Sequence, residues 1–189
     1  GVGGLSYGFA RDDNFEIVAA NEILPNMARA YSLNHPAVKV YVEDVKDFGA
    51  KKIEEDLNIK TTEIDIIVGG PPCQAYSTIG KRLANDSRGK LFQEYYRVLK
   101  EFNPKFFLFE NVKGLLSVQG GELLKTIISL FESLGYKVQR KLLNAADYGA
   151  PQIRERVVIV GSRLKGDFQY PEPTHYNPEE TTNSLSKAF

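Results

Sequence analysis

The chain has 189 residues, of which 42% are hydrophobic, and 24 basic and 24 acidic side chains give it a formal net charge of zero. This length can bury the core of one domain, and no apolar run approaches the roughly 18–20 residues that cross a bilayer. A single cysteine, Cys73, excludes an intramolecular disulfide and a cysteine-rich zinc site, so we expect no metal and a reducing, cytoplasmic setting. The balanced charge excludes a simple polycation that coats nucleic acid but is compatible with a local basic cleft.

Short β-rich runs alternate with helical patterns, which predicts an α/β fold with a mostly parallel sheet and helices on both faces. The expected strands are 16–20, 38–42, 64–68, 106–109, 137–143 and 157–160. The expected helices are 25–33, 47–58, 90–102 and 121–134. Pro25 suits a first helical turn, and Gly135 suits a C-terminal cap. From Asp167 onward, prolines without any period indicate a connection that leaves the sheet.

The chain opens on a glycine-rich run that contains Gly1, Gly3, Gly4 and Gly8. At a strand-to-helix turn, such glycines let the backbone approach a nucleotide-like ligand, although a flexible end has the same composition. Glu22 follows about 20 residues later, the spacing at which a carboxylate meets ribose hydroxyls. Asp44 ends the next predicted strand, where it can accept from an adenine amino group. Either acid alone is also compatible with a helix cap.

The segment 69–77, GGPPCQAYS, follows a buried strand and therefore lies at the carboxyl edge of the sheet, where open α/β folds bind ligands. Two glycines and two prolines restrict the backbone and leave one thiol, that of Cys73, among polar neighbours. A structural cysteine favours an apolar, buried position, so this setting indicates a nucleophile.

Two further segments deliver polar groups to the same edge. Glu110 and Asn111 end the strand that follows, and burial at the end of an apolar run predicts that Glu110 can donate a proton, unless it caps a turn. Strand alternation predicts Gln152, Arg154 and Arg156 on one side, which suits a carbonyl oxygen or a phosphate. A salt-bridged edge strand would show the same pattern.

Taken together, these segments resemble the cytosine-5 DNA methyltransferases, in particular bacterial modification methylases. GVGG, the NE and ED pairs after the second and third strands, GGPPCQAYS, ENV and QIRER occur in the family's order, and DSRGKLF (86–92) and PEPTH (171–175) are also similar. The likeness covers nearly the whole chain. It implies the Rossmann-like fold of S-adenosylmethionine-dependent methyltransferases and the transfer of a methyl group to carbon-5 of a cytosine flipped out of double-stranded DNA, with S-adenosylhomocysteine as product.

The resemblance also implies roles for single residues. Cys73 would add to carbon-6 of the ring, Glu110 would hold or protonate N3, and Arg156 would bind the base carbonyl. The residues implied to support them are Arg154, Gln152 and Asn111. The residues implied to bind the cofactor are Gly1, Val2, Gly3, Gly4, Glu22, Ile23, Asp44, Val45, Pro72 and Leu91. The residues implied to contact DNA, in a loop that closes over the flipped nucleotide, are Ser77, Lys81, Arg82, Arg88 and Lys90; a solvated basic loop is the alternative for the four cations.

Family members carry an aromatic residue before the glycine turn and, after PEPTH, a target-recognition region and further cofactor-binding segments. We therefore expect residues 1–166 to form the catalytic and cofactor-binding domain without its first strand, and 167–189 to connect it to an absent target-recognition region. We expect these 189 residues alone to bind cofactor weakly and to methylate DNA poorly.

Other functions remain compatible with parts of the pattern. An RNA (tRNA) cytosine-5 methyltransferase would use the same Cys73 and Glu110, and a catalytically incomplete cofactor-binding fragment would keep the glycine turn. A nucleotide-binding oxidoreductase is disfavoured because it has no need of the PCQ and ENV segments. We expect no membrane partner, and a cognate restriction endonuclease would share the system without touching this protein.

Overall fold

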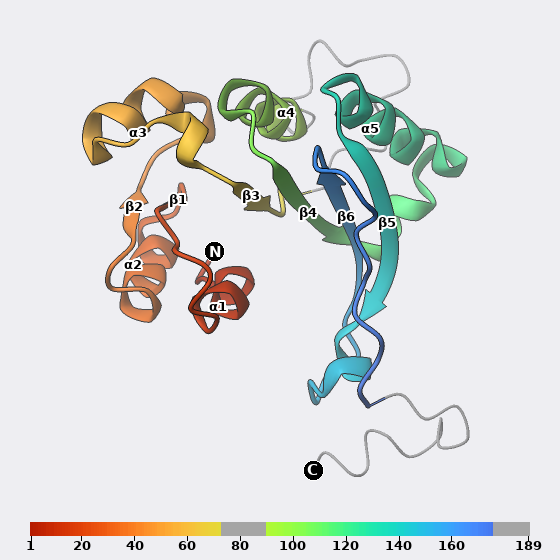
Figure 1. Ribbon diagram of the computed structural model, residues 1–189. Coiled ribbons are helices and arrows are strands. Elements are labelled where there is room, and N and C mark those ends of the chain that lie inside the picture. The colour runs from red at the N-terminus through yellow and green to blue at the C-terminus, as the bar shows by residue number, and fades with distance from the viewer. Residues whose placement is uncertain (73–89, 176–189) are drawn as a thin grey trace. The chain divides into compact units, whose positions relative to one another are not determined.

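The computed structural model of the protein describes residues 1–72 and 90–175 (Figure 1). This part of the chain is α/β, as predicted, with both parallel and antiparallel strand pairs. Its contacts divide it into two compact units: residues 1–69 with 90–105, and residues 70–72 with 106–175. Among the described helices, none has both the length and the hydropathy of a membrane span.

The first unit places two short parallel strands among helices, with Asn21 opposite Tyr41 in the register. Its helices and strands are α1 (Gly4–Ala10), β1 (Ala19–Asn21), α2 (Pro25–Asn34), β2 (Lys39–Tyr41), α3 (Ala50–Leu57), β3 (Ile66–Gly69) and α4 (Lys90–Phe102), and its short 3₁₀ turns are η1 (Val45–Asp47) and η2 (Thr61–Glu63). All predicted elements of this range are present: α4 has the predicted bounds, and the others differ from the prediction at one or both ends, whereas α1 was not predicted. The helix expected from residue 47 begins later because the residues before it form η1.

An apolar cluster holds the first unit together. Helix α4 buries Tyr95, Val98, Leu99 and Phe102, the spacing of one helical face. Val98 and Phe102 pack with Tyr41 of β2 and Ile53 of α3, and Val45 and Phe48 of the turn after β2 lie against the same cluster. The turn that carries Asp44 is therefore attached to the core of its own unit.

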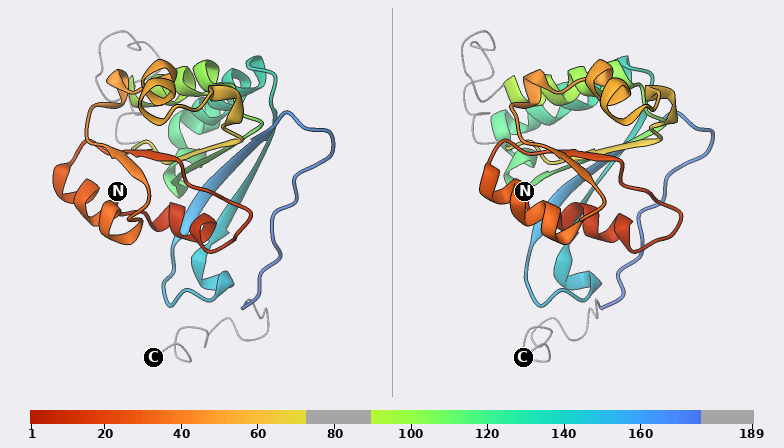
Figure 2. Two further views of the ribbon diagram at one scale, coloured as in Figure 1. Left: turned by 60° about the vertical axis from the view of Figure 1, so that its left-hand side comes forward. Right: turned by 90° about the vertical axis from the view of Figure 1, so that its left-hand side faces the viewer.

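The second unit is an antiparallel sheet covered by one long helix. Its elements are β4 (Phe106–Val112), η4 (Lys113–Leu116), η5 (Val118–Gly121), α5 (Glu122–Ser133), β5 (Lys137–Asn144), η6 (Ala145–Tyr148) and β6 (Glu155–Ser162). Strand β6 pairs with both β4 and β5 and runs antiparallel to each. Helix α5 lies on one face of these strands (Figures 1 and 2). The strands predicted here are all present and longer than expected.

Aromatic side chains fill the space between α5 and the sheet. Phe107 and Phe109 of β4 are fully buried, and their rings lie 4.5 and 5.7 Å from the ring of Phe131 in α5. Gly161 of β6 is directly opposite Phe107. A Cβ at Gly161 would lie 1.9 Å from Cε1 of Phe107, so the aromatic ring occupies the place of the missing side chain.

Residues 163–175 return along the sheet on the side away from α5 (Figure 2). The hydroxyl of Tyr170 donates to carbonyl oxygens of β5 and β6 at 3.1 and 2.9 Å. The amide of His175 donates to the carbonyl of Asp147 in η6 at 2.9 Å. The described part of the predicted connection is thus attached to the second unit, while its role as a connection stays a prediction.

Gly161→Ala is expected to destabilise the fold by about 1–3 kcal/mol or more, because the methyl group forces Phe107 out of its site. Gly114→Ala is the matched control, since the atom nearest to its Cβ, Cγ2 of Val112, lies 4.0 Å away. Urea unfolding of the two variants measures the difference. Equal midpoints for both variants would contradict this packing.

Candidate active site

A pocket of about 300 Å³ opens in the second unit, beside the C-terminal end of β4 and the start of β6. This volume is at the small end of the range for ligand sites. Its lining residues are Gly70, Pro71, Pro72, Glu110, Asn111, Val112, Arg154 and Arg156. Three segments that the sequence singled out, GGPP, ENV and RER, therefore meet at one place.

The pairing of β4 with β6 brings an acid and a base together in this pocket. Glu110 is opposite Val158 and Val112 is opposite Arg156, so Glu110 and Arg156 are diagonal neighbours on one face of the sheet. Nε of Arg156 lies 2.8 Å from Oε1 of Glu110, and the two side chains are 25% and 27% exposed.

The Glu110 side chain is 27% exposed and pairs with the guanidinium of Arg156. The sequence argument considered only the apolar residues of the same strand, whereas the partner of Glu110 lies on β6. A proton-donating role for Glu110 stays a prediction.

The loop before Cys73 is fixed against β4 at two points. At Gly70, a Cβ would lie 2.8 Å from Oε2 and 3.2 Å from the carbonyl oxygen of Glu110, so only glycine allows this approach. The side-chain amide of Asn111 donates to the carbonyl of Pro71 at 2.9 Å, and Asn111 is 4% exposed. Asn111, predicted among the catalytic residues, thus holds the loop in place in this structure.

Arg154 is held by a residue that the sequence did not single out. The side-chain oxygen of Asn144, at the end of β5, accepts from the amide of Arg154 at 2.9 Å. Gln152, by contrast, is exposed and is not among the residues that line the pocket. Strand alternation does not apply to Gln152 or Arg154 because β6 begins only at Glu155, and the supporting role of Gln152 stays a prediction.

Several predicted site residues lie outside the described residues. They are Cys73, Ser77, Lys81, Arg82 and Arg88; of Lys90 only the backbone, at the start of α4, is described. Cys73 is joined to Pro72, a lining residue of the pocket, by one peptide bond.

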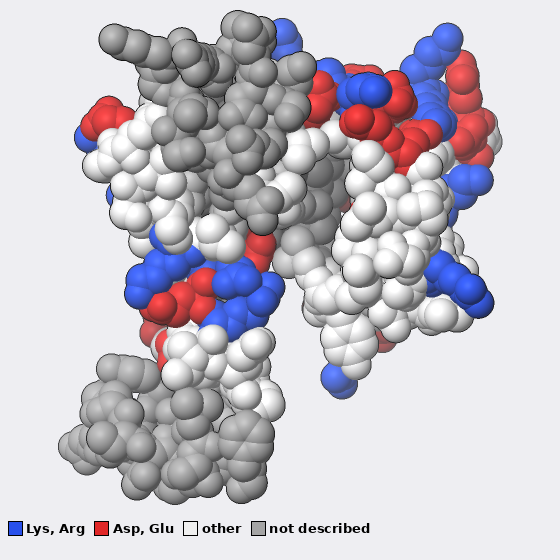
Figure 3. Space-filling view, turned by 180° about the vertical axis from the view of Figure 1, so that it is seen from behind, with Lys and Arg blue, Asp and Glu red and all other residues white. Residues whose placement is uncertain are grey.

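The charges near the pocket are largely paired. Nζ of Lys113 lies 2.8 Å from both carboxylate oxygens of Glu155, the residue before Arg156 in β6, and Arg156 pairs with Glu110. On the face shown in Figure 3, basic and acidic side chains of the described residues lie interleaved.

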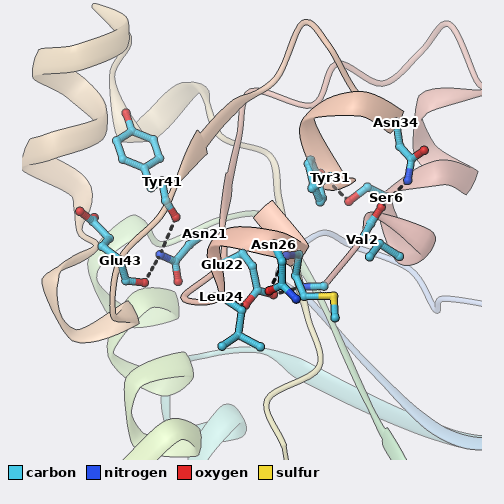
Figure 4. Close-up of polar contacts among 12 residues, drawn as sticks. Val2, Ser6, Asn21, Glu22, Leu24, Asn26, Tyr31, Asn34, Tyr41 and Glu43 are labelled. Atoms are coloured by element: carbon cyan, nitrogen blue, oxygen red, sulfur yellow. Dashed lines mark hydrogen bonds and ion pairs between the residues drawn. The ribbon is translucent and has the colours of Figure 1, made fainter. Parts of the chain in front are cut away.

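Of the two acids proposed for a nucleoside in the first unit, Glu22 directly follows β1 (Figure 4), and Asp44 lies between β2 and η1. The amide of Glu22 donates to the carbonyl of Tyr41 at 3.0 Å, and the Glu22 carboxylate accepts from the Leu24 amide at 2.9 Å and contacts the Gly1 ammonium. The side chain of Asn21, which the sequence did not single out, donates to carbonyl oxygens of Tyr41 and Glu43 at 3.3 and 3.0 Å. Asn21 thereby ties the end of β1 to the residues that precede Asp44.

Asp44 caps the turn η1, which is the alternative that the sequence left open. Its Oδ1 accepts from the amide of Lys46 at 3.1 Å. This backbone hydrogen bond holds the pKa of the Asp44 carboxyl below its usual range. The carboxylate is therefore ionised at neutral pH and can only accept hydrogen bonds, as an amino group would require.

The opening glycines have different environments. Gly3 has φ +92°, and a Cβ there would lie 2.5 Å from the ring of His35, so packing within the chain explains this glycine. A Cβ at Gly1 or Gly4 would have no described atom within 4 Å, so packing among the described residues does not require glycine at either position. Gly4 and Gly8 lie in α1 rather than in a turn.

The remaining residues proposed for the cofactor are spread over both units. Val2 and Ile23 are 45% and 57% exposed, which is high for apolar side chains. Val45 packs against the core cluster, and Leu91 is half-buried in α4. Pro72 belongs to the second unit.

Comparison with known proteins places these residues in a family. The model of the C-5 cytosine-specific DNA methylase family matches residues 1–188. The Type II methyltransferase M.FnuDI of Fusobacterium nucleatum is 48% identical over 177 residues, which are 92% of this chain and 48% of that protein. The Type II methyltransferase M.AquIA of Picosynechococcus sp. is 40% identical over 184 residues, 93% of this chain and 74% of that protein. The chain spans about half the length of most curated relatives that it matches.

The fold agrees with this relationship. A solved structure described as a DNA modification methyltransferase encoded within a prophage (E. coli) superposes with a TM-score of 0.75 at 35% identity, over 89% of this chain and 47% of that one. The predicted methyltransferase fold is therefore confirmed. Because the family model covers all but the last residue of the sequence, the chain belongs to the C-5 cytosine-specific DNA methylases.

Proposed function

We propose that the protein is a DNA (cytosine-5-)-methyltransferase that moves a methyl group from S-adenosylmethionine to carbon-5 of a cytosine flipped out of double-stranded DNA. The observation that carries the proposal is the pocket in which Glu110 and Arg156 meet Pro71 and Pro72, the residues just before Cys73. The family match and the Type II methyltransferase names of the relatives support it.

The proposed chemistry needs a thiol because carbon-5 of cytosine is a poor nucleophile. The Cys73 thiolate adds to carbon-6, and the ring becomes an enamine whose carbon-5 attacks the methyl group on the donor's sulfur. The carbon–sulfur bond of the donor breaks, and S-adenosylhomocysteine leaves. Loss of the carbon-5 proton then re-forms the double bond and expels the thiolate. Base flipping is required because a duplex covers both faces of the ring.

Glu110 and Arg156 stabilise the charge that develops on the ring. Glu110 holds or protonates N3, and Arg156 donates to the base carbonyl, with Arg154 beside it. In the structure, Nε of Arg156 contacts Glu110, and Nη1 donates to the Glu155 carbonyl at 2.8 Å. These contacts engage Nε and Nη1, so Nη2 can meet the base carbonyl while Nε keeps its partner.

Most residues proposed for the donor lie in the first unit. The Asp44 carboxylate accepts from the adenine amino group, and Glu22 accepts from the ribose hydroxyls. The space at Gly1 and Gly4 lets the backbone approach the methionine portion. Pro72 and Leu91 are also assigned to the donor in this proposal.

The remaining assignments concern DNA and the cell. Ser77, Lys81, Arg82, Arg88 and Lys90 are proposed to contact phosphates around the flipped nucleotide. We also infer a cytoplasmic enzyme of a bacterial restriction-modification system, whose cognate endonuclease acts on the same DNA without touching this protein. The Type II names of the relatives support that inference.

Methylation of DNA by the full-length protein is the direct test. Duplex DNA and tRNA are incubated separately with S-adenosylmethionine, and 5-methylcytosine is quantified by mass spectrometry after digestion to nucleosides. We expect product from DNA only, none with Cys73→Ser, and a loss of about 10²–10⁴-fold with Glu110→Gln. Glu122→Gln, an exposed carboxylate on α5, is the control that keeps full activity. Product from tRNA alone would move the assignment to RNA, and an active Cys73→Ser would refute the covalent mechanism.

Gly70→Ala tests the geometry of the pocket. Its methyl group would push the Glu110 carboxylate away from Arg156, and a shift of about 1 Å in a catalytic group can cost about 10²-fold in rate. We expect such a loss in methyl transfer with an unchanged circular dichroism spectrum, and wild-type activity for the control Gly114→Ala. A fully active Gly70→Ala would show that the position of Glu110 is not critical.

A further inference from the structure

The turn that carries Asp44 is held by a side chain from a distant helix. Nη2 of Arg97, on α4, donates to the carbonyl oxygens of Val45 at 2.9 Å and Phe48 at 2.7 Å. Val45 is the first residue of η1 and Phe48 directly follows its last residue, so Nη2 of Arg97 binds the backbone at both ends of this turn. Arg97 was not singled out by the sequence, in which it is one of several charged residues on an amphipathic helix.

Arg97 is itself fixed by two carboxylates of its own helix. Its Nε lies 2.6 Å from Glu94, one turn before it, and its Nη1 lies 2.6 Å from Glu101, one turn after it. The guanidinium thus makes four contacts, which suits arginine and not lysine, because an ammonium group has no rigid fork of donors.

Glu101 extends this network to the next helix. Its Oε1 accepts from the amide of Ala50, the first residue of α3, at 2.7 Å. A Cβ at Gly49 would lie 2.9 Å from the same oxygen, so the backbone of the turn approaches Glu101 closely. The segment between Asp44 and α3 is therefore attached to α4 at three backbone positions.

The opposite side of the turn is apolar. The ring of Phe48 lies 5.5 Å from that of Tyr41 and is stacked 6.0 Å from that of Phe102. Within the turn, the amide of Phe48 donates to the Val45 carbonyl at 3.1 Å, the same oxygen that Arg97 binds. Packing anchors one side of the turn and Arg97 anchors the other, which leaves Asp44 a narrow range of positions.

We propose that Arg97 is a positioning residue for recognition of the methyl donor: it fixes the Asp44–Val45 turn in the place from which the carboxylate meets the adenine amino group. This inference rests on the proposed function, which assigns Asp44 and Val45 to the donor. Arg97 belongs to the first unit, whereas Glu110 and Arg156 belong to the second, so we expect Arg97 to act on donor binding and not on the chemical step.

The test compares Arg97→Lys and Arg97→Gln with Lys100→Gln, which removes an exposed cation from the same helix, in the full-length protein. Calorimetry measures the affinity for S-adenosylhomocysteine, steady-state kinetics separates KM for S-adenosylmethionine from kcat, and hydrogen exchange without ligand follows the amides of Asp47, Phe48 and Ala50. We expect about tenfold weaker binding and a similar rise in KM for both Arg97 variants. We also expect kcat within about twofold of the wild type, faster exchange at the three amides, and no change for Lys100→Gln.

The outcomes separate this inference from the proposed function. Unchanged exchange at the turn in both Arg97 variants overturns the inference, whatever the affinity. A fall in kcat and Tm at constant KM also overturns it, because it would show a merely structural role. If the wild type binds no S-adenosylhomocysteine while exchange at the turn is faster in the variants, the proposed function is refuted and Arg97 stands as the residue that fixes the turn.

Discussion

The antiparallel register of β4 and β6 is the constraint on which the pocket depends. Val112 is opposite Arg156, and Glu110 lies two positions before Val112 on the same face of the sheet. The side chains of Glu110 and Arg156 can therefore pair directly across the two strands. The same register places Gly161 against Phe107, and a slip of one residue would turn every side chain of one strand to the other face. Core packing behind the sheet therefore maintains the geometry of the acid–base pair in front of it. Gly70 completes the arrangement because it lets the loop before Cys73 approach Glu110.

Much of this architecture could be predicted from the sequence, for physical reasons. Apolar runs and helical periods located nearly every element, and strand ends located Glu110, Arg154 and Arg156 at one pocket. Helix α1 was not predicted because glycines dominate the run in which it begins. The antiparallel direction of β5 and β6 was not predicted because alternation reports which face a residue occupies and not which way a strand runs. The ionic partner of Glu110 could not be inferred either, since it comes from a strand far along the chain.

The residues that escaped prediction act on the backbone. Asn21 binds the carbonyl of Glu43, the residue before Asp44. Asn144 binds the amide of Arg154, and Arg97 binds the carbonyl of Val45, both of which the sequence did identify. Such contacts have no spacing or composition that marks them, because their partners are carbonyls and amides that every residue has. These contacts hold in place the site residues whose types the sequence had already identified. Gly3 is the opposite case. The sequence predicted that it approaches a ligand, but in the structure the ring of His35 lies where a Cβ of this residue would be.

The most direct test of the covalent mechanism uses a duplex that carries 5-fluorocytosine in place of cytosine at many sites. Fluorine cannot leave as a proton does, so a thiol that attacks carbon-6 stays bonded to the ring after methyl transfer. We predict that the intact mass of the full-length protein, after reaction with S-adenosylmethionine, increases by the mass of the DNA plus one methyl group, and that Cys73→Ser shows no increase. An unmodified mass from protein that methylates ordinary DNA at full rate, or an adduct that persists in Cys73→Ser, would contradict the account.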